Sequence, residues 1–221
     1  MQNRSRCGFG EAASRQKEGK DGMIISASRR TDIPACYGQW MMARLRAGEV
    51  LVPNPYNASR ISRVALSPGN VDCIVFWTKN AAPMLPLLDE LDALGYKYYF
   101  EYTVTGYGSA LEPGLPEKER TVDTFLRLSE RLGPEGVDWR FDPVLLTSSI
   151  TPAWQLERFG ALCCALHGAT RRCVFSFADP YPGIRPSIAP LEETQMRLLA
   201  KGFADIAGEY GLPLYTCAEA V

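Results

Sequence analysis

Five amphipathic helices that each end at a glycine are the feature of this sequence that most restricts its fold. Apolar residues recur at spacings of three and four over residues 34–47, 83–94, 117–132, 151–167 and 191–210. A glycine follows each segment, and glycine adopts the left-handed conformation that often ends a helix without steric cost. Short β-branched and aromatic runs lie between the helices, at residues 24–28, 73–78, 98–105, 137–145, 173–177 and 214–217. The chain is therefore predicted to alternate strands with helices in six successive units.

Strict alternation of strand and helix predicts an α/β fold with a parallel sheet, either doubly wound or wound as a barrel. We favour a TIM-like (β/α) barrel, because no glycine-rich phosphate loop follows the first strand and polar residues recur where the strands end. Six units would form only a partial barrel. The sixth strand would then be an exposed edge, available for self-association. Its position close to Val221 suggests a truncated C-terminus, and residues 49–67 are predicted to form a hairpin over the mouth of the barrel.

The composition is that of an ordinary globular domain preceded by a polar N-terminal segment. Residues 1–22 are predicted to be a disordered N-terminal extension, and residues 23–221 to be the barrel domain. Basic residues number 24 and acidic residues 25, which leaves no field that would hold nucleic acid. No apolar run is long enough to span a membrane, and seven cysteines without a C-x-x-C pair are typical of reduced thiols. We therefore expect a cytoplasmic protein without nucleic-acid or membrane partners.

The segment after the first predicted strand carries two arginines and an aspartate just before a predicted helix. In one interpretation, Arg29 or Arg30 binds a substrate carboxylate or phosphate while Asp32 orients it. In the other, Asp32 caps the helix and the arginines are surface charges. We favour the first interpretation, which makes all three residues candidates for substrate binding.

The second predicted strand ends with an aromatic and a basic side chain two residues apart. Residues at this spacing share one face of a strand, so Trp77 and Lys79 are predicted to point the same way. Trp77 is a candidate for substrate contact. Lys79 is a candidate catalytic base or anion-binding group, and the alternative is a solvated lysine in a loop.

Charged residues occupy one face of the third and fourth predicted strands. Glu101, Arg140 and Asp142 each follow an aromatic residue that points to the opposite face. Charges inside a barrel are costly unless they pair or bind a ligand. Glu101 and Asp142 are therefore candidate catalytic residues, and Arg140 and the later Glu219 are candidate substrate-binding residues; a structural ion pair is the alternative for Arg140. No metal site is predicted, because a single histidine, His167, excludes multi-histidine sites.

Several strings of this sequence resemble one bacterial family, domain of unknown function 1848 (DUF1848). They are ISASRRTDIP at 25–34, NP at 54–55, SP at 67–68, VFWTKN at 75–80, WRFDP at 139–143 and TCAE at 216–219. The resemblance extends from Met23 to Val221. It implies that typical members continue into a cysteine-rich region similar to the iron–sulfur motif of radical S-adenosylmethionine enzymes, which this sequence lacks. An iron–sulfur cluster and S-adenosylmethionine are thus expected only in full-length relatives.

Three functions are compatible with these observations. The leading hypothesis, which the resemblance implies, is the barrel portion of an iron–sulfur, radical-type enzyme acting on a small anionic substrate, without cluster chemistry in this form. The second is a cluster-independent barrel lyase, isomerase or hydrolase that uses Lys79 or Glu101 as the base. The third is a non-catalytic ligand-binding or assembly module.

Overall fold

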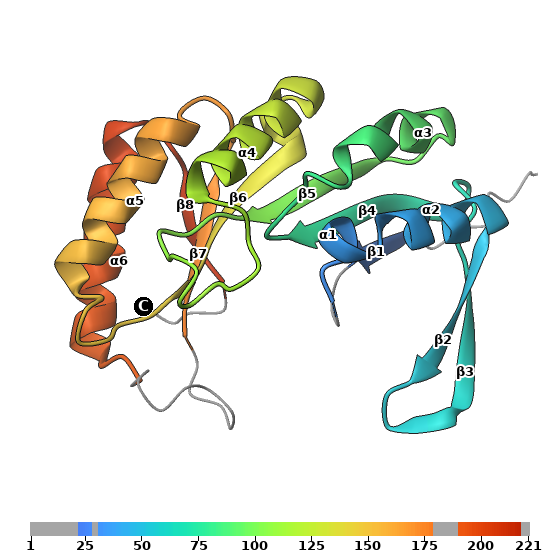
Figure 1. Ribbon diagram of the computed structural model, residues 1–221, viewed down its shortest axis with the longest axis horizontal. Coiled ribbons are helices and arrows are strands. Elements are labelled where there is room, and N and C mark those ends of the chain that lie inside the picture. Colours follow the sequence, from blue (N-terminus) through green and yellow to red (C-terminus); the bar gives the residue numbers. More distant parts are fainter. Residues whose placement is uncertain (1–21, 28–30, 179–189, 218–221) are drawn as a thin grey trace, which may run out of the picture.

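A computed structural model describes residues 22–27, 31–178 and 190–217, and its main sheet is parallel throughout (Figure 1). Its strands are β1 (Met23–Ala27), β4 (Val71–Thr78), β5 (Tyr98–Thr103), β6 (Val137–Val144), β7 (Cys173–Phe177) and β8 (Leu214–Thr216). They lie side by side in the order in which the chain visits them. A doubly wound sheet would instead reverse its strand order near the middle. The predicted six-unit partial (β/α) barrel is therefore confirmed.

Helices cover one side of this sheet and leave the other side open (Figure 1). They are α1 (Ile33–Cys36), α2 (Gly38–Ala47), α3 (Leu88–Ala93), α4 (Lys118–Leu132), α5 (Pro152–Leu166) and α6 (Glu193–Glu209), with 3-10 turns η1 (Leu85–Leu87) and η2 (Pro134–Gly136). The first predicted helix is interrupted at Tyr37, and the second is shorter than predicted because η1 precedes it. Pro86 lies within η1, where its missing N–H is tolerated better than inside an α-helix.

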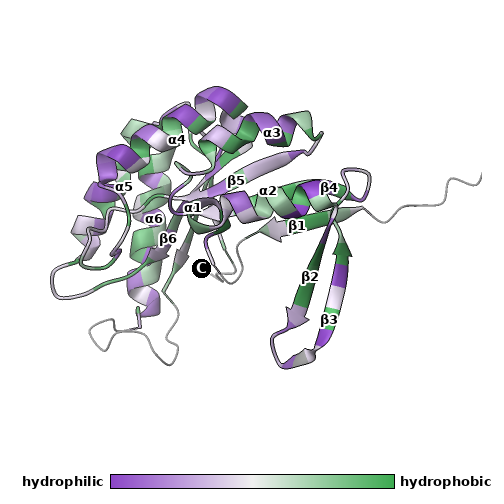
Figure 2. Cartoon of the chain, turned by 45° about the vertical axis from the view of Figure 1, so that its right-hand side comes forward, coloured by the Kyte–Doolittle hydropathy of each residue, from purple (hydrophilic) through white to green (hydrophobic). Residues whose placement is uncertain are grey.

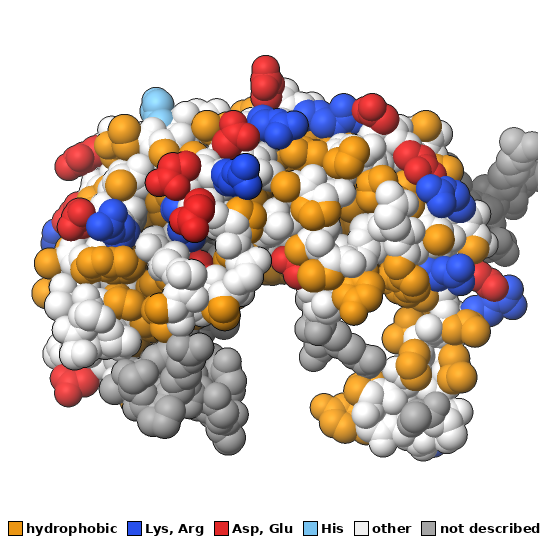
Figure 3. Space-filling view, viewed as in Figure 1, with side chains coloured by type: hydrophobic (Ala, Val, Ile, Leu, Met, Phe, Trp, Pro, Cys, Tyr) orange, Lys and Arg blue, Asp and Glu red, His pale blue; other side chains and the backbone are white. Residues whose placement is uncertain are grey.

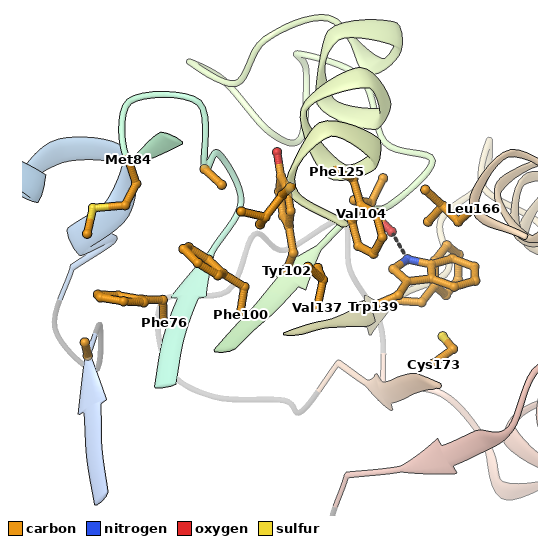
Figure 4. Packing of buried hydrophobic residues seen from close by; sticks show 14 of the residues in the cluster. Phe76, Met84, Phe100, Tyr102, Val104, Phe125, Val137, Trp139, Leu166 and Cys173 are labelled. Atoms are coloured by element: carbon orange, nitrogen blue, oxygen red, sulfur yellow. Dashed lines mark hydrogen bonds between the residues drawn. The ribbon is translucent and has the colours of Figure 1, made fainter. Parts of the chain in front are cut away.

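Apolar side chains between the sheet and the helices form the main core (Figure 4). Phe76, Phe100 and Trp139 are fully buried there, one from each of three adjacent strands. The indole Nε1 of Trp139 donates to the carbonyl oxygen of Val104 at 2.9 Å, which satisfies the only polar atom of this side chain. The outer sides of the helices are mostly hydrophilic (Figure 2). This core fixes the positions of the strands whose opposite faces carry the charged residues.

A two-stranded hairpin, β2 (Glu49–Asn54) and β3 (Asn57–Ala65), projects from the body of the molecule (Figure 1). Its base is closed by a bond from the Leu66 amide to the Gly48 carbonyl oxygen at 2.7 Å, a few residues before β4 begins. The hairpin thus leaves the sheet at the N-terminal ends of the strands, because α2 runs back to that end before the hairpin starts. The prediction that it covers the mouth at the C-terminal ends was wrong.

The edges of the sheet are β1 and β8, so the barrel does not close within the described ranges. The predicted disordered extension, residues 1–22, lies outside the described residues except for Gly22. Among the helices that the structure describes, none has the length and apolar character of a membrane-spanning segment.

Candidate functional site

The open side of the main sheet, here called the inner face, carries charged and polar side chains from adjacent strands. Its members are Trp77 of β4, Glu101 of β5, Arg140 and Asp142 of β6, Ser176 of β7 and, near the start of β6, Asp138. Each alternates with a residue of the core, as the two-residue period of a strand requires. Figure 3 shows the molecule hollowed on this side, between the hairpin and the C-terminal units.

Arg140 is the centre of this group and makes contacts to three strands. Its Nη2 and Nε atoms lie 2.9 and 3.3 Å from Asp142 Oδ2, and its Nη1 lies 3.5 Å from Glu101 Oε2. The guanidinium carbon lies 4.8 Å from the centroid of the Trp77 ring, within cation–π range. Burial opposes its charge, but the hydrogen bond to Asp142 and the nearby carboxylates raise the pKa of Arg140 above its usual value. The structure thus brings four predicted site residues together.

Glu101 is a buried carboxyl with an incomplete set of partners. Only 5% of it is exposed, and its Oε2 has no hydrogen-bond partner among the described residues. Burial and the charge of Asp138 raise the pKa of Glu101, and Arg140 and Arg172 offset this only in part. A carboxyl with a raised pKa in an open barrel is suited to proton transfer.

The raised pKa of Glu101 should make stability fall with increasing pH. Above the ordinary glutamate value of 4.5, the unfolded chain has lost a proton that the folded chain retains, so the free energy of unfolding decreases until pH passes the folded pKa. Replacing Glu101 by Gln removes this contribution. We therefore expect urea unfolding to show Glu101→Gln gaining stability relative to wild type as pH rises from about 4 to about 7. The control is Glu193→Gln in an exposed pair on α6; a Glu101→Gln profile parallel to wild type would contradict the expectation.

Asp138 was not among the sequence candidates, although it shares the inner face with Arg140. It is fully buried and receives hydrogen bonds from Arg171 Nε at 3.0 Å and from Arg172 Nη2 at 2.5 Å. The same two-residue spacing that selected Arg140 and Asp142 would have found it. Its two arginine partners indicate a structural ion pair that places a negative charge near Glu101.

Lys79 lies at the mouth, but its contacts join it to a second group. Its Nζ lies 2.5 Å from Oε1 of Glu112, whose Oε2 also accepts from the Thr105 hydroxyl at 2.8 Å and from Lys118 at 3.3 Å. Burial opposes ionisation of Glu112, yet Lys79, Thr105 and Lys118 hold its pKa below the usual range. Sequence reasoning missed Glu112, because it belongs to an irregular segment without periodicity. The Lys79 ammonium is thus engaged with a buried carboxylate.

Asp32 joins the first βα loop to the end of β4. Its carboxylate accepts from the Ala35 amide at 2.9 Å, from the Thr78 hydroxyl at 2.8 Å and from the Lys79 amide at 2.8 Å. These bonds correspond to the capping interpretation, extended to the neighbouring strand. Arg29, Arg30 and Glu219, the other predicted substrate-binding residues, lie outside the described residues.

Polar atoms without partners mark the inner face as a place where a ligand could bind. Trp77 Nε1 and Arg172 Nε, like Glu101 Oε2, are buried and lack hydrogen-bond partners within the described part of the chain. Such atoms are rare in folded proteins, because each one costs free energy when it is left unpaired. Two donors and one acceptor beneath the inner face are therefore left without partners in the described part of the chain.

The residues that the structure describes do not fit an iron–sulfur cluster. No three histidine, cysteine, aspartate or glutamate side chains come together there as ligands for a metal ion. Of the six described cysteines, Cys163 and Cys173 are buried, and burial raises the pKa of both thiols, to about 12 for Cys163. A cluster needs several thiolates at one point. We therefore assign no reaction step of the described residues to an iron–sulfur cluster.

Comparisons with known proteins give one family and two similar folds. The crystal structure of Streptococcus suis SuiB bound to S-adenosylmethionine is similar with a TM-score of 0.45 and 11% identity, covering 83% of this chain and 43% of that chain. A structure described as an α-L-fucosidase from Bacteroides thetaiotaomicron is similar with a TM-score of 0.39 and 9% identity, covering 98% and 80%. The chain spans less than half the length of SuiB, and no curated protein matches it. The family model of a domain of unknown function, DUF1848, matches residues 24–221, and the chain belongs to this family.

Proposed function

We propose that this chain is the substrate-binding barrel of an enzyme that acts on a small anionic molecule held against the inner face. The observation that carries the proposal is the group formed by buried Glu101 and Arg140 with half-buried Trp77 and Asp142, which lies on the inner face and retains unpaired polar atoms among the described residues. A scaffold without a ligand would gain from pairing or removing these atoms. The iron–sulfur radical chemistry that the family resemblance implies is part of the proposal for full-length relatives only.

The charge of the inner face limits how an anion would be bound. Glu101, Asp138 and Asp142 are matched in number by Arg140, Arg171 and Arg172, so the described group has no excess of positive charge that would attract an anion. The anionic substrate therefore depends on Arg29 and Arg30, which follow β1 in the string ISASRRTDIP and add two positive charges.

Anion binding can be measured through tryptophan fluorescence. Inorganic phosphate and pyruvate are the probes, and we expect saturable quenching by at least one of them. The double variant Arg29→Gln/Arg30→Gln should bind at least about tenfold more weakly, a loss of about 1.4 kcal/mol. Arg127→Gln, on the exposed face of α4, is the matched control and should bind as wild type does. Absence of saturable binding, or equal binding by the double variant, would overturn the proposal.

A second candidate function is a cluster-independent lyase, isomerase or hydrolase. The raised pKa and unpaired oxygen of Glu101 favour it as the base, whereas Lys79 is engaged by Glu112. The third possibility, self-association through the outer edge of β8, remains a prediction. That strand has three residues, and Tyr215 within it is 54% exposed.

A further inference from the structure

A cavity of about 350 Å³ lies between the loop that follows β5 and the loop that follows β6. Its walls include Tyr107, Ala110, Leu111, Ile150, Trp154 and the hydroxyl-bearing residues 147–149. Several of these side chains form a small hydrophobic cluster that is separate from the main core. The cavity is thus a second concave site, built by loops at the C-terminal ends of the strands and distinct from the inner face.

The floor of this cavity is rigidly built around Tyr107. The Tyr107 hydroxyl donates to the Pro143 carbonyl oxygen at 2.8 Å and accepts from the Leu145 amide at 3.1 Å and from Gln155 Nε2 at 2.9 Å. Burial raises the pKa of Tyr107 to about 12, so the hydroxyl stays neutral at physiological pH. Its ring is stacked on Trp154, with centroids 5.8 Å apart and planes 6° apart.

A buried amide beneath Tyr107 holds this arrangement. Gln155 is fully buried, and its Nε2 also donates to the Leu145 carbonyl oxygen at 2.7 Å. Its Oε1 has no hydrogen-bond partner among the described residues. Burying a glutamine in an apolar cluster is costly, and here it positions a tyrosine at the cavity wall.

The lining indicates the chemical class of the occupant. Two aromatic rings, Leu111 and Ile150 provide apolar contacts, residues 147–149 provide hydroxyls, and none of the described lining residues is charged. A charged ligand would lose hydration without gaining a counter-charge, whereas an uncharged ring with a hydroxyl group would match both kinds of wall. We propose that this cavity binds an uncharged aromatic molecule that carries a hydroxyl group.

The proposed function does not involve this cavity, although the cavity lies close to the inner face. The Tyr107 hydroxyl is bonded to Pro143, the residue that follows Asp142. An occupant that moves Tyr107 would therefore also act on the strand end that holds Asp142. Binding in the cavity does not require an anion on the inner face, so the two proposals can fail independently.

The test uses phenol as the uncharged probe, with benzoate and benzylammonium as charged probes of similar size. Titrations followed by NMR should shift the Trp154 indole signal saturably with phenol, at a dissociation constant in the millimolar range that suits a fragment. Both charged probes should bind at least about tenfold more weakly. Equal binding of the three probes, or no saturable shift with phenol, would overturn the proposal.

Two variants, each with an alanine replaced by phenylalanine, show where phenol binds. Ala110→Phe fills the cavity from its wall, and it should weaken phenol binding at least about tenfold. Ala153→Phe adds the same ring to an exposed position next to Trp154 that does not line the cavity, and it should bind phenol as wild type does. Unchanged binding by Ala110→Phe would also overturn the proposal. If that variant does not fold, the comparison of the three probes on wild type still decides.

Discussion

Replacing Arg140 by methionine should lower the free energy of unfolding by about 3–5 kcal/mol, the usual cost of breaking a buried ion pair. Only 6% of the Arg140 side chain is exposed, and it is bonded to Asp142 and lies 3.5 Å from Glu101. Methionine has a similar shape and removes the charge, which leaves these carboxylates facing each other without compensation. Urea unfolding at pH 7 measures the effect, because the midpoint shifts while the slope stays constant.

The control for this experiment is the same substitution at an arginine on the surface. Arg127 lies 3.9 Å from Asp123, and both side chains are more than 60% exposed, so Arg127→Met should change stability by no more than about 0.5 kcal/mol. Adding Glu101→Gln to Arg140→Met removes one uncompensated charge, so the double variant should be more stable than Arg140→Met alone. An Arg140→Met variant as stable as Arg127→Met would show that the inner-face charges are solvated rather than paired.

Replacing Asp32 by alanine should cost about 2–4 kcal/mol, more than the loss of a helix cap alone. The substitution removes the acceptor of the Ala35 amide, and it also leaves the Thr78 hydroxyl and the Lys79 amide without their partner. These two donors belong to a different unit of the barrel from the helix that Asp32 caps. Thermal unfolding should therefore show a lower midpoint, because the substitution weakens both the cap of α1 and its contact with the end of β4.

Asp32→Asn and Asp123→Ala complete this test. Asparagine keeps one acceptor oxygen and should lose less than alanine does, whereas Asp123→Ala on the exposed face of α4 should be close to neutral. If Asp32→Ala were as stable as wild type, the bonds to Thr78 and Lys79 would carry no stability. The substrate-orienting interpretation of Asp32 would then be the better one.

The helix ends were predictable because their cause is local. Gly48, Gly95, Gly133, Gly168 and Gly211 all have φ between 61° and 82°, a conformation that other residues rarely adopt. The sequence could also place Glu101 and Arg140 on one face, because strand alternation is strictly periodic. The prediction that Trp77 and Lys79 point the same way did not take into account where β4 ends. Its last residue is Thr78, and alternation no longer holds beyond it.

Contacts between loops were not predictable from the sequence. Glu112 belongs to a segment without helix or strand, and it meets Lys79 only because two βα loops converge in space. The hairpin was predicted as an element, but its position was not, since that depends on which end of the sheet α2 reaches. Asp138 is different, because its periodic signal was present and only its partners, Arg171 and Arg172, come from a distant loop.

The match between strand order and chain order has a consequence for how the molecule comes apart. Each β/α unit touches mainly the units before and after it, so the cohesion of the sheet resembles that of a linear stack, in which the two end members have one neighbour each. Amide hydrogen exchange should then be slowest in β5 and β6 and become faster toward β1 and β8. Such a gradient lets the ends of the sheet open while its charged centre stays assembled.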